Sequence, residues 1–164
     1  MPRMATKAAN NVFYKARLEA AKWNDRLSSR EGAAEIAGID RTRLANIELG
    51  NIYPHPEEVL LLCDTYSAPE LANHYCSRCC PLGEMTVNEI ELQQFETIVL
   101  QLIKELKNLP AIKDDLVDIA ADGVIDSTEK PRMERILDAL NEMSIQIESL
   151  KLYYRKLFEK EGVK

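Results

Sequence analysis

The sequence contains no stretch that approaches the roughly 20 consecutive apolar residues needed to span a bilayer. Residues 1–7 also lack the apolar run of a secretory signal. We therefore expect a cytoplasmic protein that makes no membrane contact. Such a location disfavours a standing disulfide among the four cysteines.

Histidine is scarce, and the surroundings of the two histidines do not suggest catalysis. His55 lies between prolines and His74 lies beside a cysteine-rich segment, so no pair of nucleophile and base can be proposed. Neither a glycine-rich loop that would hold phosphate nor a metalloprotease motif is present. The sequence therefore predicts a protein that is not an enzyme and needs no cofactor.

Strand-type alternation of apolar and polar residues is absent as well. Apolar residues instead recur at steps of three and four, and this period predicts an all-α fold. The first half, residues 1–83, is expected to form a five-helix domain. From capping residues, glycines and prolines, its helices are expected at about 6–22, 29–37, 41–49, 56–67 and 70–75. The apolar positions of the first helix are Val12, Ala16, Leu18 and Trp23.

Residues 84–164 are predicted to form an acidic domain of long helices. A helix capped by Thr86 is expected to stop at Pro110, with a short helix at 112–121 and a last helix of about thirty residues or more after Pro131. The first of these carries a heptad-type stripe of Leu92, Phe95, Val99, Leu102, Leu106 and Leu109. The last helix repeats this spacing, so both stripes are expected to bury against another helix.

The net charge of −6 is distributed unevenly along the chain. Residues 1–83 hold ten basic and ten acidic side chains, whereas residues 84–164 hold eleven basic and seventeen acidic ones. Residues 1–30 alone carry seven basic against two acidic side chains. A local basic face can bind phosphate whatever the charge of the whole chain, so the acidic total does not exclude nucleic acid as a partner.

The most informative segment runs from Ser29 to Gly50. Ala34 is small where two helices would cross, Gly38 permits a sharp turn, and Ile39 would plug that turn into the core. Asp40 is a residue type that caps the helix that follows. The segment therefore predicts two short helices joined by a tight turn.

The second of these helices has side chains suited to reading DNA. If Leu44 and Ile47 point inward, the period of 3.6 residues places Thr42 and Asn46 outward, with Arg41, Arg43 and Ala45 beside them. Arginine can donate two hydrogen bonds to guanine, asparagine can pair with adenine, and threonine can meet the methyl group of thymine. The outward side therefore favours double-stranded DNA as a partner.

At these residues the chain resembles the XRE family of helix-turn-helix transcriptional regulators, the class that includes Cro and lambda repressor. The resemblance covers residues 24–69 and is carried by Ser29-Arg30-Glu31, Ala34, Gly38-Ile39-Asp40, Leu44, Ile47-Glu48-Leu49-Gly50 and the Pro54/Pro56 loop. More loosely, the first half is similar to regulators on mobile elements of Gram-positive bacteria.

The resemblance implies a set of DNA-binding residues and one internal ion pair. The DNA-binding set is Ser29, Arg30, Arg41, Thr42, Arg43, Asn46, Asn51 and Tyr53. Asn51 and Tyr53 would hold the DNA backbone, and Glu48 would pair with Arg17. The chain departs from the family in the longer stretch between Arg17 and Ser29 and in the small Ala33 and Ala37.

Three readings of the whole chain remain open at this stage, the third being a metal or redox sensor that uses the cysteines around Cys76. In the first, a homodimer held by residues 84–164 binds an operator of two half-sites and represses transcription, since one helix-turn-helix rarely binds tightly alone. In the second, the first half is only a helical hairpin within a protein-interaction module, such as an antitoxin or adaptor, whose second half binds a partner protein. Residues 84–164 could also act as a sensor.

Two segments resemble metal sites without completing one. Cys76-Ser-Arg-Cys79 lies beside Cys80 and His74, with Cys63 as a conceivable further ligand, but a single CxxC is half of a zinc site. Residues 118–129 match several positions of a calcium loop but have Ala120 where an oxygen ligand is needed. Buried or surface thiols, and a helix end followed by a new cap, explain the same residues, so no metal is expected.

Overall fold

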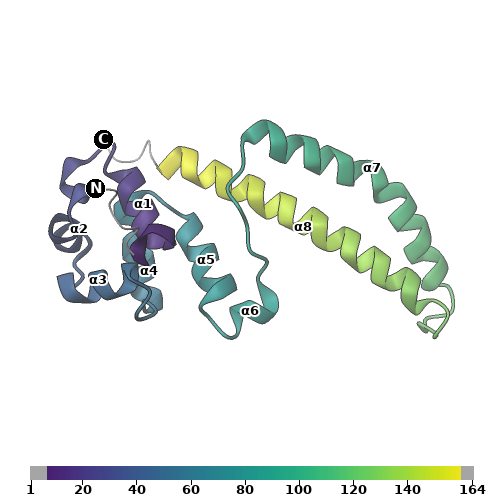
Figure 1. Cartoon of the computed structure of the whole chain (residues 1–164). Coiled ribbons are helices and arrows are strands. Elements are labelled where there is room, and N and C mark those ends of the chain that lie inside the picture. Colours follow the sequence, from purple (N-terminus) through teal and green to yellow (C-terminus); the bar gives the residue numbers. More distant parts are fainter. Residues whose placement is uncertain (1–6, 160–164) are drawn as a thin grey trace. The chain divides into compact units, whose positions relative to one another are not determined.

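A computed structural model of the chain describes residues 7–159. It confirms the all-α prediction, because every regular element is a helix and no strand occurs between residues 7 and 159 (Figure 1). No helix in this range is both long and apolar enough to cross a membrane. The described residues form two compact units, one made of residues 7–89 with 155–159 and the other of residues 90–154.

The first unit contains six α-helices and two short 3-10 helices, η1 and η2. They are η1 (Lys7–Asn10), α1 (Val12–Ala20), η2 (Asp25–Ser28), α2 (Arg30–Ala37), α3 (Arg41–Glu48), α4 (Pro56–Tyr66), α5 (Glu70–Arg78) and α6 (Gly83–Thr86). Their apolar sides meet in one core whose fully buried members include Leu27, Leu44, Ile47, Leu62 and Leu71. Whether residues 1–83 fold alone as a five-helix domain stays a prediction.

The predicted helix over 6–22 is wrong in its extent, and its start at Thr6 lies outside the described residues; of its four predicted apolar positions, Val12 and Ala16 pack against the core. Asn11 interrupts it, because its side-chain oxygen accepts the backbone N–H groups of Phe13 (2.9 Å) and Tyr14 (3.1 Å) and thereby begins α1. Phe13 and Ala20 are buried, whereas the predicted apolar positions Leu18 and Trp23 are exposed. The inward side of α1 instead includes an arginine, which the sequence pattern does not indicate.

The starts and stops around the predicted turn are confirmed. Ser29 caps α2 by accepting the backbone N–H of Gly32 (3.0 Å), and Asp40 caps α3 by accepting that of Arg43 (2.9 Å). Gly38 ends α2 at a φ of 67°, in the left-handed region that glycine adopts without strain. Pro56 opens α4 as expected, but Leu60, predicted as an apolar position of that helix, is exposed.

The second unit is a hairpin of α7 (Phe95–Ile119) and α8 (Lys130–Glu159), whose last residues from 155 belong to the first unit. The predicted start at Thr86 is wrong, since Thr86 ends α6 and α7 begins at Phe95. The predicted stop at Pro110 is wrong too, and the separate helix at 112–121 is part of α7. An interior proline costs a helix about 3 kcal/mol, which the apolar side that continues beyond it can offset.

Ile112 and Ile119 of α7 pack against Ile136 of α8 in the core of this hairpin. The connection between the helices is a turn and a new helix start. Asp126 accepts the backbone N–H of Glu129 (3.0 Å), and a Glu129 carboxylate oxygen accepts that of Asp126 (3.2 Å). These reciprocal bonds account for Asp126 and Glu129 in the segment that resembles a calcium loop.

Candidate nucleic-acid interface

A tight turn at Gly38 joins α2 to α3. The N–H of Gly38 donates to the carbonyl of Ala34, which also accepts the N–H of Ile39 at 3.0 Å. Ala34 and Ile39 are buried, as the sequence predicts. The turn is therefore fixed by backbone hydrogen bonds and held against the core by a side chain.

Helix α3 has a buried side and a solvent side. Leu44 and Ile47 are almost fully buried, whereas Arg41 and Thr42, at the start of the helix, are exposed. Asn46 is half-buried. The prediction that Leu44 and Ile47 point inward and Thr42 points outward is thus confirmed.

Beneath α3, the fully buried Glu48 carboxylate binds two arginines. Nε of Arg17 donates to Oε1 of Glu48 at 2.6 Å, and Nε of Arg30 donates to Oε2 at 2.6 Å. Arg17 also donates to the carbonyls of Leu27 (2.9 Å) and Ser28 (3.0 Å). Burial lowers the pKa of Arg17, but hydrogen bonding and the charge of Glu48 outweigh it, so this pKa is raised.

These contacts confirm the pairing of Arg17 with Glu48 that the family resemblance implies. The longer stretch before Ser29 does not prevent the pairing, since that stretch forms η2 and supplies the carbonyls that Arg17 binds. The cluster ties α1, η2 and the start of α2 to the end of α3. It therefore fixes the angle at which α3 is presented.

Arg30 and Arg43, two of the expected DNA contacts, are already engaged within the protein. Arg30 binds Glu48, its guanidinium lies 6.0 Å from the centre of the Tyr14 ring, and its side chain is about one-third exposed. Arg43 binds Glu58 of α4 through two nitrogens, with Nη2 to Oε2 at 2.8 Å. Sequence reasoning did not predict the partner of Arg43.

The pairing of Arg43 with Glu58 affects both groups. The hydrogen bond between the two side chains lowers the pKa of Glu58 and raises the pKa of Arg43. Glu58 also accepts the N–H of His55 at 2.6 Å, so the same carboxylate caps α4. The pair through Nε and Nη2 orients the Arg43 guanidinium and neutralises its charge. Arg43 is therefore suited to a hydrogen bond in a fixed direction more than to attracting phosphate by its charge.

Asn46, Asn51 and Tyr53 lie together at the far end of α3. The side-chain amide of Asn51 donates to the Asn46 oxygen at 3.0 Å, and Tyr53 is 70% exposed. Asn51 and Tyr53 line a cleft of about 300 Å³ together with His74. Burial lowers the pKa of this histidine, which favours its neutral form. The cleft has both polar and apolar lining residues, and Phe13 and Ile47 are among the apolar ones.

Two acids outside residues 1–30, Glu35 and Glu48, neutralise part of the basic excess of this segment. Arg17 and Arg30 share Glu48, Lys22 pairs with Glu19 at 2.7 Å, and Arg26 pairs with Glu35 at 2.9 Å. Acids outside residues 1–30 thus balance several of the basic side chains within it. The exposed Lys15 remains as a candidate contact for phosphate.

The cysteine segment folds as part of α5 and the turn after it. Cys63 is buried, and Cys76, Cys79 and Cys80 are half-buried free thiols. Burial raises the pKa of the Cys79 thiol, which disfavours the thiolate that a metal would need. Between residues 7 and 159, no three His, Cys, Asp or Glu side chains are grouped as metal ligands would be.

Comparison of the chain with protein-family models, with curated proteins and with solved structures found no match.

Proposed function

We propose that the protein is a sequence-specific DNA-binding regulator that inserts the start of α3 into the major groove. The observation that carries this proposal is the exposed pair Arg41 and Thr42 at the first turn of a helix whose opposite side is fixed by the buried Glu48 cluster. Arg41 and Thr42 carry hydrogen-bonding groups that suit base edges, and the fixed helix would present both in one orientation.

In this proposal the side chains divide into two roles. Arg41, Thr42 and Arg43 read base edges, with Arg43 oriented by Glu58. Ser29, Arg30, Asn51 and Tyr53 contact the sugar-phosphate backbone. Repression follows from occupation of a promoter site, and two copies of the chain would read two half-sites about 34–36 Å apart.

The test begins with selection of bound sequences from random double-stranded DNA, followed by gel shifts on the selected site. Arg41→Ala and Arg43→Ala should each weaken binding by about ten- to a hundredfold, because each loss removes a base contact. Arg78→Ala is the matched control, since Arg78 is an exposed arginine of the same unit that pairs with Glu89. Failure to enrich any sequence, or equal binding by all three variants, would contradict the proposal.

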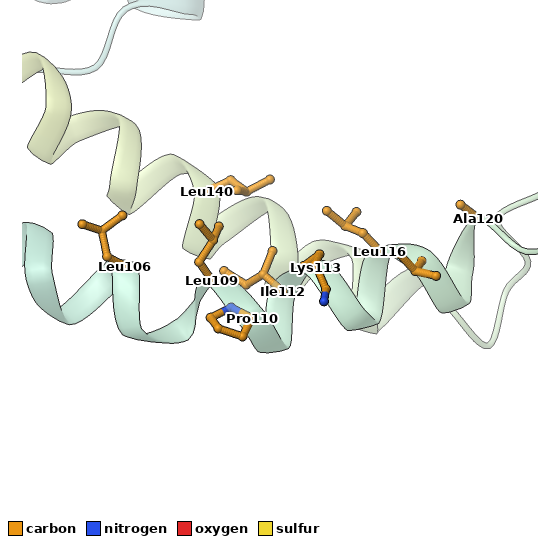
Figure 2. Close-up of a pocket in the computed structure, with 9 residues that line it drawn as sticks. Leu106, Leu109, Pro110, Ile112, Lys113, Leu116, Ala120 and Leu140 are labelled. Atoms are coloured by element: carbon orange, nitrogen blue, oxygen red, sulfur yellow. The ribbon is translucent and has the colours of Figure 1, made fainter.

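A second candidate function is a protein-interaction module that works through residues 84–164. The exposed apolar side chains of the hairpin favour it, as does an apolar groove of about 690 Å³ between α7 and α8 (Figure 2). A stable complex with another protein, formed by a chain that does not bind DNA, would favour this candidate over the regulator.

A further inference from the structure

Helix α7 carries two apolar stripes, and only one of them is buried in the hairpin. The first contains Ile98, Ile112 and Ile119, which are buried. The second contains exposed Ile103, Leu106, Pro110, Val117 and Ala120. Lys113 fills the one position of the second stripe that is not apolar. The steps of three and four along this stripe are those of a coiled-coil surface.

The second stripe borders the groove between α7 and α8. Leu106, Pro110 and Lys113 line it from α7, Ala120 lines it at the cap that follows α7, and Leu140 lines it from α8 (Figure 2). In residues 90–154, six apolar side chains are buried, whereas twelve large apolar side chains are exposed. This excess is typical of a surface that another helix covers.

We propose that a second copy of this chain covers the second stripe, with the two α7 helices antiparallel. The twofold axis of this pair then passes midway between Pro110 and Lys113. It places the larger side chains of one copy opposite smaller side chains of the other copy. Ile103 lies opposite Ala120 of the second copy, and Leu106 lies opposite Val117 of the second copy. The stripe is complementary to itself, as an interface with a twofold axis requires.

The charges beside the stripe select the antiparallel arrangement. Lys107 directly follows Leu106, and Asp114 directly follows Lys113, so both charges lie on the same edge of the second stripe. In the antiparallel pair, each Lys107 therefore meets Asp114 of the other copy. In a parallel pair, the two Lys113 side chains would share one layer and repel each other. In the antiparallel pair, each Lys113 meets Pro110 and keeps its ammonium near Asp114 of its own chain, 3.0 Å away.

This interface would supply the dimer of the regulator, so its purpose rests on the proposed function, although its test does not require DNA. Sedimentation velocity of the full chain over a range of concentrations should show dimers. Lys107→Asp and Asp114→Lys should each raise the dissociation constant about tenfold, because each change turns two attractive pairs into repulsive ones. The double variant K107D/D114K should restore dimerisation, since it exchanges the two charges. Lys104→Asp is the control, because Lys104 is an exposed lysine of α7 on neither stripe.

Three results would overturn the inference: a wild-type chain that stays monomeric, single variants that associate like wild type, or a double variant that is not restored. A chain that passes this test and selects no DNA would leave the interface standing and would contradict only the regulator. Conversely, a chain that binds DNA but fails the charge exchange would contradict only the interface. Circular dichroism of each variant shows that helix content is kept.

Discussion

Glu48 is a carboxylate with no exposed surface, and guanidinium groups from α1 and α2 bind its two oxygens. A buried charge is tolerated only when it is paired and hydrogen-bonded, so the three side chains depend on one another. Replacing one of them leaves the others without compensation. The orientation of α3 therefore depends on the Glu48 carboxylate and its two guanidinium partners, which lie away from the solvent-exposed side of the helix.

Glu48→Gln should destabilise the fold by about 3–5 kcal/mol, because it leaves the buried Arg17 without its counter-charge. Urea unfolding followed by circular dichroism measures this change. Glu58→Gln is the matched control, since it removes the same charge from a partly exposed pair and should have only a small effect. Equal destabilisation by the two variants would mean that burial does not set the strength of the Glu48 cluster.

At the scale of elements, the α2–α3 turn needs its glycine for conformation and not for space. Gly38 has a φ of 67°, but a Cβ atom added there would meet no heavy atom within 4 Å. Gly32 differs, because a Cβ atom there would lie 2.1 Å from the carbonyl oxygen of Arg26. The first glycine is thus replaceable by a residue that tolerates left-handed backbone, whereas the second is not.

Gly38→Ala should destabilise the protein by about 1–2 kcal/mol, the cost of left-handed backbone for an L-residue. Gly38→Asn should cost less, because asparagine adopts this conformation more readily than alanine. Thermal unfolding of both variants measures the difference. If the alanine and asparagine variants lost the same stability, steric contact and not backbone conformation would explain why glycine occupies position 38.

At the scale of the whole molecule, the two units differ in how completely they bury apolar side chains. The first unit has a continuous core of fifteen buried residues, whereas the buried cluster between α7 and α8 has three. Because isolated helices gain most of their stability from packing, the hairpin is expected to be the less stable unit when the chain is a monomer.

Hydrogen exchange should therefore depend on protein concentration in one unit only. Amides of α7 should exchange more slowly as the concentration rises, because association stabilises the hairpin by mass action. Amides of α3 should be unaffected. Val117→Glu, which places a charge in the exposed stripe of α7, should abolish the concentration dependence. An α7 that is equally protected at every concentration would show that it needs no second copy.

The sequence by itself determined the helical class, the position of the turn and the caps of α2 and α3. These features are local, since a capping side chain acts on N–H groups two or three residues away and a glycine acts on its own φ. The solvent side of α3 could likewise be predicted from the helical period, which places Thr42 on the side opposite the apolar Leu44 and Ile47. No partner elsewhere in the chain was needed for any of them.

Only the tertiary structure decided that Arg30 and Arg43 are engaged within the protein and that α7 continues past Pro110. Arg30 and Glu48 are 18 residues apart, and Arg43 and Glu58 are 15 apart, so no helical period relates them. Burial of an arginine on α1 and of isoleucines beyond the proline is stabilised by partners that folding brings together. Such long-range compensation outweighs local preference, and local sequence patterns cannot specify it.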